Sequence, residues 1–155
     1  MRRKDREITE LDRIVEIIKK SNVCRVAFLD EEYPYIVPLN FGFDIQSKKI
    51  ILYFHCAKEG KKISLIQKNN KVCFEMDCSN KLIEGEKACD YTMNYESVIG
   101  YGTIEIASDS EKMTGLRALM KQYTPREDLS YDERAVNAVT VLKLTVDKIT
   151  GKVYL

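Results

Sequence analysis

The sequence lacks tryptophan, has a single histidine, His55, and carries only 3 prolines and 7 glycines among 155 residues. So little proline and glycine excludes a collagen-like or low-complexity chain. One histidine excludes any metal or catalytic site that needs two. Because 45% of the residues are hydrophobic, a chain of this length can bury a core without disulfides or a structural metal. We therefore expect one domain over residues 1–155.

An excess of one charge is also missing, since 25 basic residues stand against 24 acidic ones and leave a net charge of +1. Proteins dedicated to nucleic acids usually carry a clear basic excess. The basic residues near the N-terminus, Arg2, Arg3, Lys4 and Arg6, are interspersed with acidic ones. We interpret them as a solvated tail, and we predict no nucleic-acid partner.

Long apolar runs are absent as well. None approaches the roughly 20 residues that span a bilayer, and no apolar stretch follows the basic N-terminus to make a signal peptide. The cysteines are odd in number, and no pair has the C-x-x-C spacing of a zinc or redox motif. They are Cys24, Cys56, Cys73, Cys78 and Cys89. These features predict a cytoplasmic protein with reduced thiols and no membrane partner.

Alternating apolar and polar residues predict a chain made mostly of strands. The expected strands cover residues 23–29, 33–43, 49–54, 72–76, 95–106 and 142–146. Pro34 and Pro38 place the second of these at a sheet edge or a break in the ladder. Short turns between the first three strands favour antiparallel pairing. About six strands with few helices predict a mainly β (α+β) fold, a closed antiparallel barrel with flanking helices.

Helical periodicity appears in three places. A helix capped by Thr9 carries the stripe Leu11, Ile14, Val15 and Ile18, a short one holds Ile63 and Ile66, and a third holds Met113, Leu116, Met120 and Tyr123. The polar stretches 79–92 and 124–132 are expected to be loops, and Thr150-Gly151 is expected to turn the chain.

Common nucleotide and hydrolase motifs are missing. The sequence has no P-loop and no G-x-S-x-G elbow, and Gly100-Tyr101-Gly102 does not continue into a dinucleotide fingerprint. Gly100 and Gly102 alternate on one strand face, which fits either barrel curvature or the close approach of a ligand.

The stretch from Tyr53 to Lys62 is the strongest candidate site. It runs from a strand through His55 to a helix start that carries Lys61 and Lys62. A helix start presents free N–H groups and a partial positive charge, and two lysines there make a phosphate site. Taken alone, the same residues also fit a packed histidine and two solvated lysines.

Three stretches, in this order and spacing, resemble the pyridoxamine 5'-phosphate oxidase-like proteins, and within them the nitroimidazole-resistance branch. They are YIVPLNFG at residues 35–42, YFHCA at 53–57 followed by GKK at 60–62, and YESVIGYG at 95–102. The resemblance covers nearly the whole chain. It implies a six-stranded antiparallel split β-barrel that binds FMN, as a homodimer with flavin at the subunit interface.

The resemblance also implies a set of flavin-contacting residues. They are Val37, Pro38, Leu39, Asn40, His55, Cys56, Lys61, Lys62 and Ser97. Residues 37–40 would lie along the isoalloxazine ring, and His55-Cys56 near the ribityl chain and phosphate. Lys61-Lys62 would pair with the phosphate, and Ser97 would approach the flavin from one subunit or the other. Neither a metal site nor a particular catalytic residue is implied.

The function implied is an oxidoreductase that passes electrons from reduced flavin to a small nitroaromatic or quinone-like acceptor. The alternative is a flavin- or haem-binding carrier or sensor without turnover, with His55 as a haem ligand. Pyridoxamine phosphate oxidase activity itself is not expected. The oxidases have basic residues where this chain has Tyr35 and Asn40, and they use a C-terminal tryptophan that this chain lacks.

Overall fold

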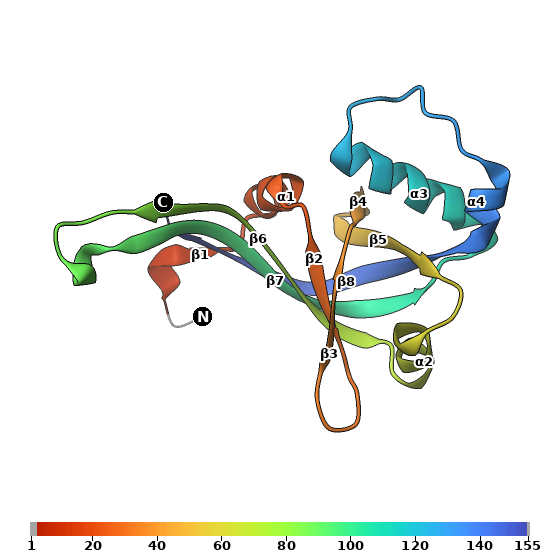
Figure 1. The fold of residues 1–155 in the computed structure, drawn as a ribbon, viewed down its shortest axis with the longest axis horizontal. Helices are drawn as coiled ribbons and strands as arrows, with labels where there is room; N and C mark the ends of the chain where they lie inside the picture. Colours follow the sequence, from red (N-terminus) through yellow and green to blue (C-terminus); the bar gives the residue numbers. More distant parts are fainter. Residues whose placement is uncertain (1–2, 155) are drawn as a thin grey trace.

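An antiparallel β-sheet forms the body of the protein (Figure 1). The computed structural model describes residues 3–154. The strands are β1 (Glu7–Ile8), β2 (Cys24–Phe28), β3 (Tyr35–Leu39), β4 (Gly42–Gln46), β5 (Lys49–Ala57), β6 (Lys71–Ile83), β7 (Thr92–Ile106) and β8 (Val139–Tyr154). Their order in the sheet is β3-β2-β6-β7-β8-β5-β4, with β1 also paired to β8. The predicted antiparallel fold is confirmed, but this sheet has eight strands rather than six.

The two ends of the sheet are consecutive in the chain. β3 and β4 are its outermost strands, and only Asn40 and Phe41 separate them. Since no ladder joins β3 to β4 among the described strands, the barrel is open at this seam and not closed as expected. The single strand predicted over residues 33–43 is therefore two strands. Pro38 lies in edge strand β3, where a missing N–H costs least, as its presence predicted.

Helices cover parts of the sheet. They are α1 (Leu11–Lys20), α2 (Lys61–Lys68), α3 (Asp109–Tyr123) and α4 (Glu133–Ala138), with 3-10 turns η1 (Lys4–Arg6) and η2 (Ala88–Asp90). Ile14, Ile17 and Ile18 of α1 are fully buried, as its stripe predicted for two of them. The predicted Thr9 cap is wrong. Glu10 occupies the N-cap position without a side-chain bond, and the Thr9 N–H instead donates to the Glu10 carboxylate.

Helix α3 packs on β4 and β5 through glycine. A Cβ on Gly42 would fall on the α3 backbone at Ala118 and Leu119, so the helix lies directly on this strand. Its buried face holds Gly115 and Leu119, whereas Met120 and Tyr123, predicted to face the core, are 38% and 41% exposed. Both side chains instead line a cleft beside the sheet.

Strands β6 and β7 continue beyond the body as a two-stranded arm, which we define as residues 79–94 (Figure 1). The loop predicted over 79–92 is therefore wrong at both ends. A bulge at Ser79, whose φ is +59°, shifts the register, and pairing then resumes with Leu82 opposite Met93. The predicted turn at Thr150-Gly151 is also wrong, because both residues pair with β7 inside β8.

Gly100 and Gly102 serve packing within the chain. A Cβ on Gly100 would meet the ring of Phe74, and one on Gly102 would meet the backbone of Thr145. The register shift of β7 against β8 falls between Tyr101 and Gly102. Of the two interpretations left open by the sequence, these contacts favour strand curvature. Among the described residues, no helix is long and apolar enough to cross a membrane.

Candidate functional site

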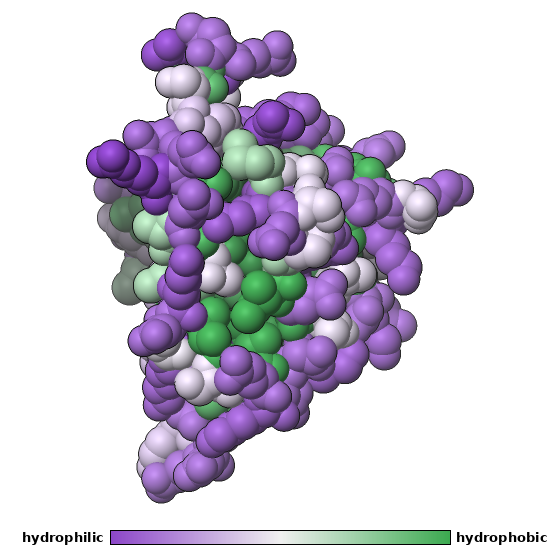
Figure 2. Space-filling model, turned by 90° about the vertical axis from the view of Figure 1, so that its right-hand side faces the viewer, coloured by the Kyte–Doolittle hydropathy of each residue, from purple (hydrophilic) through white to green (hydrophobic). Residues whose placement is uncertain are grey.

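A cleft of about 590 Å³ opens between α3, α4, the segment joining them and the end of β5. Leu116 and Met120 of α3 and Val136 of α4 supply apolar walls, while Asn40 and His55 supply polar groups. The face of the molecule on this side carries an apolar area enclosed by polar surface (Figure 2). A mostly apolar hollow with a few convergent polar groups is the usual form of a small-molecule site.

Strand alternation places His55 at the cleft. Phe54 and Cys56 are buried, so the side chain of His55 between them faces outward. The same alternation turns the Cys56 thiol into the core, where burial raises its pKa and the nearby charge of Lys62 lowers it in part. Only the backbone of Cys56 is therefore available to a ligand on the outer face.

Tyr123 holds Asn40 at the opposite wall. Its hydroxyl donates to the carbonyl of Asn22 at 2.8 Å and accepts from the N–H of Phe41 at 3.0 Å. Phe41 is fully buried, so this bond fixes the junction between β3 and β4. Asn40, one residue earlier, is consequently exposed at the mouth of the cleft.

The other residues predicted along the ring lie on β3. The side chains of Val37 and Leu39 pack against the core, whereas Pro38 is exposed. Because β3 pairs only with β2, its second edge is open. Residues 37–39 thus present main-chain groups along this open edge, and Asn40, which lines the cleft, follows them.

Helix α2 begins a few residues after His55. Gly60 precedes it with a φ of +133°, a conformation that favours glycine, and its carbonyl accepts the N–H groups of Ile63 and Ser64. In the described part of the chain no side chain caps this start. The N–H groups of Lys61 and Lys62 therefore remain directed outward at the positive end of the helix.

The two lysines have different surroundings. The Lys61 ammonium lies 2.5 Å from a carboxylate oxygen of Asp30 and 4.8 Å from the centre of the Tyr35 ring. The hydrogen bond that Lys61 donates to Asp30 raises the pKa of Lys61. Lys62 makes no ion pair within residues 3–154, so its charge is the freer of the two for a ligand.

Ser97 lies apart from this group. It faces Asp77 on β6 and Lys152 on β8. His55 faces Val141 on the same β8, so eleven residues separate the two positions along that strand. At about 3.3 Å a residue this is up to about 36 Å. Within one chain, Asn40 and His55 line the same cleft, and α2 begins a few residues after His55, whereas Ser97 does not line the cleft.

Sequence reasoning missed the helical wall of the cleft. α4 has only six residues, and the bond from the Ala135 N–H to the Asp132 carboxylate, which caps it, follows no long apolar stripe. The exposed Met120 and Tyr123 were assigned to the core by periodicity alone. An unusually wide apolar stripe on α3 was the only signal for this wall.

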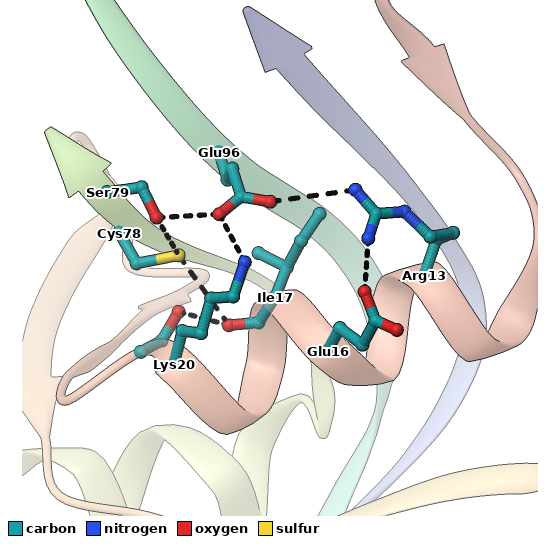
Figure 3. A network of polar contacts seen from close by, with 8 residues as sticks. Arg13, Glu16, Ile17, Lys20, Cys78, Ser79 and Glu96 are labelled. Atoms are coloured by element: carbon teal, nitrogen blue, oxygen red, sulfur yellow. Dashed lines mark hydrogen bonds and ion pairs between the residues drawn. The ribbon is translucent and has the colours of Figure 1, made fainter. Parts of the chain in front are cut away.

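A second polar cluster lies away from the cleft, where α1 meets the base of the arm (Figure 3). Glu96 is 1% exposed and accepts hydrogen bonds from Lys20 at 2.7 Å and from the Ser79 hydroxyl at 2.6 Å. Burial raises the pKa of Glu96, but these two bonds outweigh it and the net shift is downward. The second carboxylate oxygen has no hydrogen-bond partner among the described residues, and a nitrogen of the Arg13 guanidinium lies 3.9 Å from it. This cluster fixes the arm to the body.

The comparison with known families is decisive for the fold. The family model described as pyridoxamine 5'-phosphate oxidase matches residues 10–153. The chain belongs to the pyridoxamine 5'-phosphate oxidase family. No curated protein matches it.

Solved structures of similar proteins have the same fold. A candidate 5-nitroimidazole antibiotic resistance protein of Bacteroides thetaiotaomicron is 38% identical, with a TM-score of 0.81 over 95% of this chain and 86% of that one. The flavocytochrome of Azotobacter vinelandii is 18% identical, with a TM-score of 0.81 over 100% and 72%. An FAD- and haem-binding protein of Mycobacterium smegmatis is also 18% identical, with a TM-score of 0.81 over 96% and 73%. These likenesses confirm the split-barrel fold.

Proposed function

We propose that the protein is an FMN-binding flavoprotein that passes electrons to a small nitroaromatic or quinone-like acceptor. The observation that carries this proposal is the meeting of Asn40 and His55 at one apolar cleft. The open-edged strand β3 ends just before Asn40, and the basic start of α2 follows a few residues after His55. The 38% identity to the nitroimidazole resistance protein supports it. So do the flavin-binding relatives that share the fold.

The donors available fit the two ends of a flavin mononucleotide. The open edge of β3 offers main-chain groups at residues 37–40, which suit the polar edge of a flat ring. The start of α2 offers free N–H groups and the ammonium of Lys62, which suit a phosphate. His55 lies between these two regions along the chain, at the position that the ribityl chain would occupy.

Residues 37–40 would orient the ring, and the α2 start would hold the phosphate. When bound, flavin supplies the hydride or electron transfer. The walls from Leu116, Met120 and Val136 would exclude water and admit a flat apolar acceptor. Among the residues that line the cleft, Asp132 is the only one with a formal charge when His55 is neutral. An acceptor with an anionic group is therefore disfavoured.

A homodimer is part of this proposal. Ser97 lies eleven positions along β8 from the position of His55 and does not line the cleft of its own chain, so in this proposal it joins the site from a second copy. Each copy would then contribute most of one flavin site and Ser97 of the other.

The visible spectrum of the purified protein, with FMN added if it is colourless, tests the proposal. We expect the two flavin absorption bands to remain with the protein through gel filtration. We also expect nicotinamide-driven reduction of nitroaromatics or quinones by the loaded protein. A protein that retains no flavin would refute the assignment.

A haem-binding protein is the second candidate, because the exposed side chain of His55 opens on an apolar cleft. Imidazole in such a hollow is a usual axial ligand. A Soret band that disappears in His55→Ala would select this function over the first. Flavin bands that survive in that variant would reject it.

A further inference from the structure

A second hollow, of about 660 Å³, lies between α3 and the segment that joins it to α4. It adjoins the cleft, because Met120, Leu129 and Tyr131 line both spaces. The cleft is mostly apolar, whereas several charged side chains line the hollow. A ligand that occupies both spaces therefore needs a flat apolar part joined to a charged part.

The charge of the hollow is mainly positive. Arg117 and Lys121 lie four residues apart on α3, so they share one side of the helix. Neither makes an ion pair in the described part of the chain. Arg126 also lines the hollow, but two hydrogen bonds of 3.0 Å hold its guanidinium to Asp128. Glu127 is the one acidic residue in the lining. Two free cations against one carboxylate suit an anion such as phosphate.

The charge in the cleft has the opposite sign. Asp132 is the only charged residue of its lining when His55 is neutral. One oxygen of this carboxylate accepts the Ala135 N–H at 2.9 Å, and the other makes no hydrogen bond among the described residues. A ring that becomes positively charged in the cleft is therefore stabilised by Asp132.

The hollow and the start of α2 are two separate places for phosphate. In Figure 1, α2 lies below the end of β5, and the segment joining α3 to α4 lies above it. The proposed function assigns the start of α2 to the phosphate of FMN. A phosphate in the hollow would belong to a different molecule.

We propose that the hollow binds the phosphate groups of a dihydronicotinamide dinucleotide, the electron donor of the proposed function, on which this inference rests. Arg117 and Lys121 would hold phosphate, and the nicotinamide ring would enter the cleft past Met120. A hydride, with its two electrons, leaves C4 of this ring for the oxidised flavin, and the ring becomes a pyridinium cation near Asp132. The oxidised dinucleotide then leaves, and the acceptor enters the same cleft.

Titration of the FMN-loaded protein with NAD⁺ and with NADP⁺ tests the phosphate site. These oxidised nucleotides cannot reduce flavin, so calorimetry measures binding without turnover. Arg117→Ala/Lys121→Ala, at two exposed side chains, should raise the dissociation constant on the order of tenfold. Lys49→Ala/Lys112→Ala removes the same charge from lysines that line neither space, and it should change nothing. Glu127→Gln should tighten binding.

Asp132→Asn tests where the ring lies. Asparagine caps a helix as well as aspartate does, so α4 is retained and only the charge is lost. NADP⁺ should bind up to about fivefold more weakly, as for an exposed charge pair. The 1,4,5,6-tetrahydro derivative of NADPH has a neutral ring and does not reduce flavin, and its affinity should stay the same. An equal change for both nucleotides would reject the placement of the ring beside Asp132.

The two nucleotides identify which phosphate is bound. Weaker binding of both in Arg117→Ala/Lys121→Ala would assign the pyrophosphate to the hollow, and weaker binding of NADP⁺ alone would assign the 2'-phosphate. Equal affinity in this variant and in the control variant, or no binding of either nucleotide, would overturn the proposal.

The same titrations on flavin-free protein separate this inference from the proposed function. Nucleotide binding that is weakened in Arg117→Ala/Lys121→Ala, in a protein that retains no FMN, would keep the phosphate site and reject the proposed function. Retained FMN with equal nucleotide affinity in both double variants would do the opposite.

Discussion

The Lys61 ammonium lies 2.5 Å from a carboxylate oxygen of Asp30, which joins the start of α2 to the segment between β2 and β3. The next residue, Lys62, has no such partner among the described residues. Two adjacent lysines that look equivalent in the sequence therefore have different tasks. Lys61 positions the helix start, and Lys62 keeps a free charge.

Lys62→Ala should weaken FMN binding more than Lys61→Ala. Removing a charge-assisted hydrogen bond to the phosphate costs about 1–3 kcal/mol, which is roughly a ten- to hundredfold rise in dissociation constant. Lys61→Ala should have a smaller effect, because its charge is shared with Asp30. Flavin fluorescence titration measures both constants, with Lys68→Ala at the other end of α2 as control. Unchanged FMN affinity in both variants would show that the phosphate does not bind at the start of α2.

Tyr123→Phe should destabilise the fold and loosen the cleft. The variant leaves the buried N–H of Phe41 without its acceptor, which costs about 1–3 kcal/mol. Urea unfolding measures the loss, and FMN titration should show weaker binding because Asn40 adjoins the freed junction. Tyr33→Phe, at a side chain that is 71% exposed, should change neither measurement. Equal stability of the Tyr123 and Tyr33 variants would contradict the role of this hydroxyl.

Gly42→Ala should be more damaging than Gly60→Ala. A methyl group at position 42 falls on the backbone of α3, and overpacking of this kind costs about 1–3 kcal/mol or more. At Gly60 nothing lies within 4 Å of an added Cβ, so only the strained φ contributes there. Thermal unfolding compares the two variants. A larger loss in Gly60→Ala would show that α3 does not pack on β4 as closely as described.

Glu96→Gln should destabilise the protein at neutral pH but not in acid. Folding lowers the pKa of Glu96 below its ordinary value of 4.5, through the bonds from Lys20 and Ser79. The stabilisation is therefore complete above about pH 4.5 and is lost as pH falls through the folded pKa. Near neutral pH we expect the wild-type protein to be more stable by about 1–3 kcal/mol.

Urea unfolding near pH 7 and at a pH below the folded pKa of Glu96 measures how this difference depends on protonation. Glu75→Gln is the control, because Glu75 pairs with Arg25 at a partly exposed site. Such pairs contribute about 0–1 kcal/mol. A stability difference between wild type and Glu96→Gln that stays constant into acid would show that the charge of Glu96 is not what matters.

The sequence predicted the elements that depend on short-range patterns of residues. The alternation around Val26 and Val98 identified β2 and β7, and Pro38 identified an edge strand. The same alternation did not predict the strands of the arm, because a bulge at Ser79 interrupts the period of two. Ile106 continues the alternation of the buried Ile104, yet it is 49% exposed at the end of β7. Whether a residue at such a position is buried depends on what packs against it, and not on its residue type.

The candidate site, like the fold, could be predicted only in part from the sequence. His55 and the start of α2 could be located from the sequence, because a strand end followed by glycine and lysines is a local signal. That Asn40 shares a cleft with His55 depends on Tyr123, which lies 82 residues from Phe41 in the chain. No local signal reports such a contact. The separation of Ser97 from the cleft likewise depends on register along β8.

The order in which the strands are made has a consequence for biosynthesis. β8 is the last described strand, yet it lies in the middle of the sheet, paired with β7, β5 and β1. Until residues 139–154 leave the ribosome, the strands form two separate pieces, β3-β2-β6-β7 and β5-β4. The edges of β5 and β7 that pair with β8 stay exposed until β8 has been made. The nascent chain is therefore most vulnerable to mispairing until residues 139–154 have been synthesised.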